Sequence, residues 1–147
     1  MKTAIAFHST HHGNTRKLVE AIADKHDVKL IDLAAGADGD LSDYDRIGFA
    51  SGVYGGGLAR ELVAFADERL PEGKEVFYLY TSSITKESAL KQVRKIAADR
   101  GCREVGAYYS KGYDTFGPFK LVGGVGKGHP TEDEICGAVA FYDGLDG

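Results

Sequence analysis

Apolar and polar positions along the chain alternate between two patterns, which predict strands and helices in turn. Short continuous apolar runs are typical of strands buried on both faces, and apolar residues three and four positions apart are typical of helices that pack on a sheet. These patterns predict strands at 3–7, 28–33, 46–50, 76–80 and 102–109, with helices beginning near Asn14 or Thr15, over 58–70, over 89–97 and after an N-cap at Thr131. Such alternation predicts an α/β fold, a parallel sheet with helices on both faces, in a single domain over residues 1–147.

The turn between the first strand and the first helix is rich in hydroxyl side chains. Residues 8–15 read His-Ser-Thr-His-His-Gly-Asn-Thr and lead directly into the amphipathic run. A helix that begins there points free backbone N–H groups and the positive end of its dipole at the turn. The hydroxyls of Ser9, Thr10 and Thr15 add donors, so the turn is a candidate phosphate site. The alternative is that Asn14 or Thr15 only caps the helix.

Two later strands also end in unusual loops. Residues 51–57 contain three successive glycines, and residues 81–83 are Thr-Ser-Ser. In open parallel sheets, ligands bind beyond the carboxyl ends of the strands, at the point where the strand order reverses. The three loops should therefore converge on one edge, and this convergence favours a ligand site over a simple helix cap.

Length, composition and charge exclude several other classes of protein. The chain has 147 residues, 43% hydrophobic and 27% charged, and a net charge of −4, which are values of a soluble globular domain. Lys and Arg are scattered, which argues against nucleic-acid binding, and the sequence holds no apolar run long enough to cross a membrane. The chain enters its first strand directly, so we expect no signal peptide and a cytoplasmic protein with Cys102 and Cys136 reduced.

The familiar nucleotide and metal motifs are missing. The sequence contains no GxGxxG fingerprint. Around Gly126-Lys127, Gly128 replaces the hydroxyl residue of a Walker motif and Leu121 replaces its first glycine. The histidines among residues 8–12 have no fourth metal ligand near them in sequence, so we expect no metal.

Four short motifs resemble the flavodoxin family and together span the chain. Residues 10–15, Thr-His-His-Gly-Asn-Thr, resemble the phosphate loop of that family. Residues 41–49 resemble the lead-in to its third strand and that strand, and 51–56 resemble its first flavin loop. Residues 113–119 and 127–130 resemble the tail of a subset of short flavodoxin-like proteins.

The resemblance implies an open five-stranded sheet of order 2-1-3-4-5 and one non-covalently bound FMN. The residues that it assigns to the cofactor are Ser9, Thr10, His11, His12, Gly13, Asn14, Thr15, Ser51, Gly52, Val53, Tyr54, Gly55, Gly56, Thr81, Ser82, Ser83, Tyr113 and Phe116. Tyr54 would stack on the flavin ring, which aromatic side chains favour. The backbone of residues 55–57 would face the flavin N5, and the loop from Thr81 would bind the pyrimidine edge or the ribityl chain.

His12 departs from the family pattern, because it stands where the family usually has Thr or Ser. One hypothesis is that its ring nitrogen donates to the phosphate, whose negative charge would favour the histidine cation. The alternative is that His12 faces solvent without a partner.

The loop after the fourth strand also departs from the pattern, because residues 81–84 include no aromatic side chain. Tyr54 would then stack alone, or an aromatic from the tail, Tyr113, Phe116 or Phe119, would cover the other face of the flavin. The alternative for the tail aromatics is ordinary packing against the fifth strand and the last helix.

The leading functional hypothesis is a monomeric FMN-binding electron carrier that shuttles electrons between redox protein partners, a reductase and an acceptor. Its net charge is mild, whereas typical flavodoxins use a strongly negative surface to steer their partners. A first alternative is a small FMN-dependent oxidoreductase of the quinone, porphyrinogen or NAD(P)H:flavin type. A second is a flavodoxin-like binding module without flavin, since a fold does not fix a function.

Overall fold

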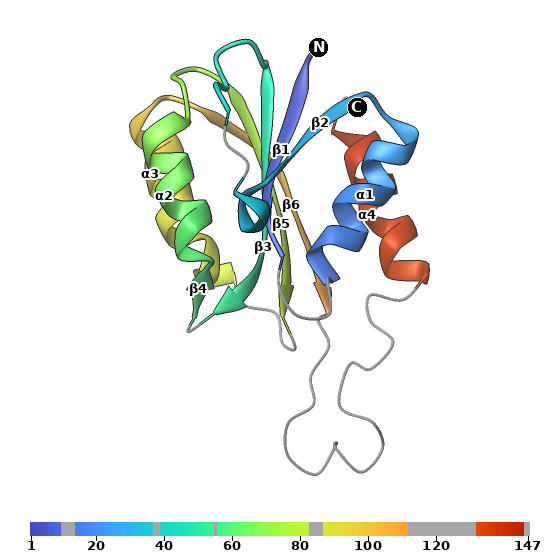
Figure 1. Ribbon diagram of the computed structural model, residues 1–147. Helices are drawn as coiled ribbons and strands as arrows, with labels where there is room; N and C mark the ends of the chain where they lie inside the picture. Colours follow the sequence, from blue (N-terminus) through green and yellow to red (C-terminus); the bar gives the residue numbers. More distant parts are fainter. Residues whose placement is uncertain (10–13, 37–38, 55, 83–86, 112–131, 146–147) are drawn as a thin grey trace.

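The computed structural model describes residues 1–9, 14–36, 39–54, 56–82, 87–111 and 132–145. Its elements in chain order are β1 (Thr3–His8), α1 (Asn14–Lys25), β2 (Val28–Asp32), η1 (Leu33–Ala35), β3 (Arg46–Tyr54), β4 (Gly57–Leu58), α2 (Arg60–Arg69), β5 (Glu75–Ser82), η2 (Glu87–Leu90), α3 (Lys91–Asp99), β6 (Arg103–Lys111) and α4 (Glu132–Gly144). Helices α1 and α4 cover one face of the sheet, and α2 and α3 cover the other (Figure 1).

The long strands lie in the order β2-β1-β3-β5-β6, and all of these neighbours are parallel. Counted without the short β4, this is the order 2-1-3-4-5, so the expected fold and strand order are confirmed. The sheet also contains β4, which pairs antiparallel with the end of β3 and was not expected. The strand order reverses at β1, and the chain leaves β1 and its neighbour β3 toward opposite faces, through α1 and α2 (Figure 1).

The core consists of two hydrophobic layers, one on each face of the sheet. Consecutive residues of β1 alternate between them: Ala4 and Ala6 belong to the layer under α2 and α3, and Ile5 and Phe7 to the layer under α1 and α4. This double burial explains why the strands read as continuous apolar runs. Gly48 in the central strand β3 is required by packing, because a Cβ there would overlap the ring of Phe77.

Strand ends at the carboxyl edge differ from the expectation. Residues 51–54 and 81–82 were expected to be loop, but they continue β3 and β5. These residues stay in the strands because they still pair with neighbouring strands: Ser51 pairs with His8 of β1, and Thr81 pairs with Gly52 of β3. The second helix begins at Arg60 rather than at residue 58, which belongs to β4. The expected N-cap at Thr131 lies outside the described residues.

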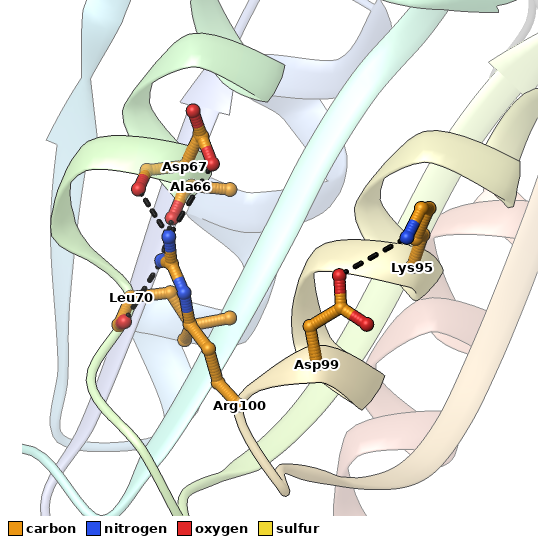
Figure 2. Close-up of polar contacts among 6 residues, drawn as sticks. All are labelled: Ala66, Asp67, Leu70, Lys95, Asp99 and Arg100. Atoms are coloured by element: carbon orange, nitrogen blue, oxygen red, sulfur yellow. Dashed lines mark hydrogen bonds and ion pairs between the residues drawn. The ribbon is translucent and has the colours of Figure 1, made fainter.

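Arg100, which follows α3, ties that helix to the C-terminal end of α2 (Figure 2). Its Nη1 donates to the carbonyl oxygens of Ala66 and Leu70, at 2.8 and 3.0 Å, and its Nη2 donates to a carboxylate oxygen of Asp67 at 3.3 Å. The last carbonyls of a helix lack partners within the helix, and the dipole places negative charge there. The guanidinium therefore satisfies both needs and holds the two helices together.

A cluster of charged residues occupies the amino ends of β3, β5 and β6. The buried Arg46 donates to Glu75 through Nε at 3.1 Å, and Arg103 donates to the other carboxylate oxygen at 2.8 Å. The hydrogen bond from Arg103, aided by Arg46 and opposed by partial burial, holds the pKa of Glu75 below its ordinary value. This cluster lies at the opposite end of the sheet from the loops of the candidate site.

Candidate functional site

The N-terminus of α1 has the features of an anion site. Ser9 follows β1, and its hydroxyl oxygen accepts a hydrogen bond from the backbone N–H of Arg16 at 3.2 Å. The first turn of α1 carries no acidic residue, and the side chain of Thr15 is buried within it. Since no carboxylate in this described turn balances the positive end of the dipole, a bound anion would be stabilised there.

Thr15 contacts a second predicted site region. Its Oγ1 lies 3.2 Å from Oγ1 of Thr81 at the end of β5, and the two threonines are only 2% and 5% exposed. Thr81 pairs in the sheet with Gly52 of β3, so this contact spans the strand that separates β1 from β5. The expected convergence of these regions is therefore found in the structure, and their role as ligands stays a prediction.

Ser51, at the same edge, uses its hydroxyl on the protein backbone. The Oγ donates to the carbonyl of Gly52 at 2.7 Å and accepts from the N–H of Ala59 at 3.0 Å. Ala59 is the N-cap of α2, so the Ser51 hydroxyl holds the residue from which that helix begins. The hydroxyl thus closes the hairpin that carries residues 52–58.

The hairpin itself has a backbone conformation that requires glycine. Gly56 has φ = +89°, in the left-handed region that side chains other than glycine rarely adopt. Val53 lies half-buried in β3 and packs against the core layer under α2 and α3. Tyr54 ends β3 and pairs with Gly57, which places its backbone at the rim of the candidate site.

Tyr109 in β6 contacts the end of β5 and was missed by the reasoning from sequence. Its hydroxyl donates to the carbonyl oxygen of Ser82 at 2.9 Å, and its ring centroid lies 5.4 Å from that of Tyr80. The signal in the sequence was a pair of tyrosines near the end of the fifth strand. The pattern predicted the strand but gave no reason to connect either tyrosine with the site.

Several predicted site residues are not placed by the structure. Those outside the described residues are Thr10, His11, His12, Gly13, Gly55, Ser83, Tyr113 and Phe116. The side chains of Asn14 and Tyr54 are likewise not described. The hypotheses on His12 and on the aromatic cover of the flavin therefore stay predictions.

Two further contacts that involve carboxylates lie near this edge. His8, at the end of β1, has its Nε2 3.6 Å from a carboxylate oxygen of Glu61 in the first turn of α2. The first turn of α4 is acidic, and Glu134 there accepts a hydrogen bond from the hydroxyl of Ser110 at 2.6 Å. No helix in the described part of the chain is both long and apolar enough to span a membrane.

Comparisons with known proteins agree with this architecture. A family model described as a flavodoxin domain matches residues 5–112. An uncharacterized protein of Methanocaldococcus jannaschii is 34% identical over 143 residues, which cover 96% of this chain and 95% of that protein.

Solved structures with low sequence identity share the fold. Oxidised flavodoxin 1 of Bacillus cereus matches with a TM-score of 0.73 at 16% identity, over 99% of this chain and 97% of that one. A flavoprotein of Lactobacillus acidophilus, solved in complex with FMN, matches with a TM-score of 0.60 at 20% identity, over 74% of this chain and 92% of its own. At these identities the likeness shows the fold alone.

Proposed function

Because the chain belongs to the flavodoxin domain family, we propose that it binds one FMN at the carboxyl edge of its sheet. The observation that carries this proposal is the contact between Thr15 and Thr81. It joins an anion-favouring helix N-terminus to the end of β5, so a phosphate and a ring system attached to it can be held together. The FMN complex of the Lactobacillus flavoprotein, which shares the fold, supports the same choice of ligand.

The donor set at this edge fits the cofactor. The phosphate of FMN is a dianion, which suits backbone N–H groups of the first turn of α1 and the hydroxyls of Ser9 and Thr15. Thr81 and Ser82 would lie toward the ring or the ribityl chain. Tyr54 would stack on the ring, and the backbone of 55–57 would face its N5.

We further propose that the protein passes electrons between a reductase and an acceptor protein, as a cytoplasmic monomer. The flavin, when bound, supplies the redox chemistry, and the protein sets its potential by packing and by nearby charge. The buried polar side chains beside the N-terminus of α1 are those of Ser9, Thr15 and Thr81, and all three carry hydroxyls. Hydroxyls are suited to holding and orienting a cofactor.

The first test is the titration of FMN with purified protein. We expect quenching of flavin fluorescence, and Thr15→Val should weaken binding by about 1.5–3 kcal/mol, the contribution of a hydrogen bond to a charged group. Thr3→Val is the matched control, because Thr3 is also a buried threonine but bonds Tyr142 at the other end of β1. A parent protein that leaves FMN fluorescence unchanged contradicts the proposal.

The second test separates a carrier from an enzyme. Flavin-loaded protein, once reduced, should transfer electrons to an added haem protein such as cytochrome c. It should show no sustained oxidation of NAD(P)H with a quinone when it is the only protein present. Sustained turnover would instead support the small FMN-dependent oxidoreductase.

A further inference from the structure

We propose that Tyr109 is a positioning residue that fixes the end of β5 against the ring side of the bound flavin. The inference rests on the proposed function, because it assigns Thr81 and Ser82 to the flavin site. It concerns a residue of β6, an element that carries none of the residues assigned to the cofactor above. Tyr109 acts through the backbone of Ser82.

The register of the sheet explains how Tyr109 reaches that backbone. Tyr109 pairs with Tyr80, and Ser82 pairs with Lys111, so the ring of Tyr109 leans two residues along the neighbouring strand. Its hydroxyl then meets the carbonyl oxygen of Ser82 at 2.9 Å. The ring of Tyr80, 5.4 Å away between centroids, packs beside it and supports this direction.

Consecutive residues at the end of β5 are thereby held on opposite faces of the sheet. Thr81 meets Thr15 on the face covered by α1, and the carbonyl of Ser82 is bound by Tyr109 from the layer under α2 and α3. The Thr15 contact joins the strand to the proposed phosphate turn. The Tyr109 contact joins the strand to β6 instead, so we expect it to act on the ring end of the ligand.

This difference separates the two contacts experimentally, because riboflavin has the ring and ribityl chain of FMN but no phosphate. Tyr109→Phe should weaken FMN and riboflavin binding by the same factor, and the strength of one neutral hydrogen bond sets an upper limit of about tenfold. Thr15→Val should weaken FMN binding more than riboflavin binding. The ratio of the two affinities therefore reports which end of the ligand a residue serves.

Tyr108→Phe is a matched control from the preceding position of β6. Tyr108 lies on the opposite face, and its hydroxyl donates to a backbone carbonyl as well, that of Glu134 in α4, at 2.8 Å. The control thus removes the same chemical group and the same kind of hydrogen bond, but it leaves β5 untouched. Both variants keep their aromatic ring, and urea unfolding of each checks that the fold is retained.

The experiment measures FMN and riboflavin affinities of the parent and both variants by fluorescence quenching. It also measures amide hydrogen exchange at residues 80–82 in the flavin-free protein. We expect Tyr109→Phe to weaken both ligands equally and to speed exchange at these amides, and Tyr108→Phe to do neither. Unchanged exchange, equal affinities in the two variants, or an effect on FMN alone would overturn the role of Tyr109. A parent that binds neither flavin would instead overturn the proposed function, and this role with it.

Discussion

Replacing Ser51 by alanine tests whether this residue serves the fold or the ligand directly. The resemblance to flavodoxins assigns Ser51 to the cofactor, whereas the structure shows its hydroxyl bonded to the carbonyl of Gly52 and to the N–H of Ala59. Alanine removes both hydrogen bonds and little volume. The variant should therefore lose stability mainly through the backbone groups left behind.

The magnitude follows from the burial of those groups. Ser51 is 0% exposed and Ala59 is 3% exposed, so water does not replace the lost acceptor. A buried donor left without a partner costs about 1–3 kcal/mol, and a lost neutral hydrogen bond about 1 kcal/mol. We expect a loss of about 2–3 kcal/mol in the free energy of unfolding. With a urea m-value of about 2 kcal/mol/M, the midpoint should fall by about 1–1.5 M.

The assay combines urea unfolding, followed by circular dichroism, with FMN titration of the folded variant. Ser88→Ala in η2 is the control, since that serine is exposed. FMN affinity should fall less than stability, because the hairpin of residues 52–58 is loosened rather than stripped of a ligand. A variant as stable as the parent that has lost most of its FMN affinity would refute this reasoning and make Ser51 a direct ligand.

Other substitutions test packing and charge away from the site. Gly137→Ala should lower the urea midpoint although alanine favours helices, because the Cβ of the new alanine would overlap the hydroxyl of Tyr108. Adding Tyr108→Phe removes that hydroxyl and should restore part of the lost stability in a double-mutant cycle. Tyr78→Phe should raise the free energy of unfolding by about 1 kcal/mol, since the buried hydroxyl of Tyr78 finds no hydrogen-bond partner in the described structure. Arg103 lowers the pKa of Glu75 below its ordinary value of 4.5. The ionised Glu75 therefore stabilises the folded protein above pH 4.5, and this stabilisation is lost as the pH falls through the folded-state pKa. Glu75→Gln should flatten the acid side of a plot of urea midpoint against pH.

The order of elements could be predicted from the sequence because the central strands β1, β3 and β5 have long runs buried on both faces. Such strands appear as continuous apolar runs, and the helices between them as amphipathic stretches. The carboxyl ends of β3 and β5 could not be predicted in the same way. Residues 51–57 are glycine-rich and 81–83 carry hydroxyls, which locally indicates loops, and pairing with neighbouring strands extends β3 to Tyr54 and β5 to Ser82. The short β4 depends on a hairpin pairing, Val53 with Leu58, that leaves no periodic signal.

The residues of the candidate site also fall into two groups, those marked by a local pattern in the sequence and those defined by contacts with other elements. Thr15 and Thr81 could be found because both are local features, Thr15 in the hydroxyl-rich stretch that opens the first helix and Thr81 directly after the apolar run of its strand. The role of Ser51 could not, since its acceptor function is defined by Ala59 on another element. Tyr109 could not be found either, because it bonds the backbone carbonyl of Ser82, a group that every residue has and that no sequence pattern marks.

The distribution of buried hydroxyls explains why this edge, rather than another, is suited to a ligand. Among the described residues, most buried Ser and Thr side chains lie at the carboxyl ends of the strands and the adjoining helix turn, namely Ser9, Thr15, Ser51, Thr81 and Ser110, and Thr3 at the amino end of β1 is the exception. Burying a polar group is unfavourable unless it is hydrogen-bonded, and each of these hydroxyls has a partner within the protein. A hydroxyl also holds more hydrogen-bonding capacity than one such contact uses. The hydroxyls of α1, β3 and β5 lie at the same edge of the sheet, where the proposed phosphate would use that capacity.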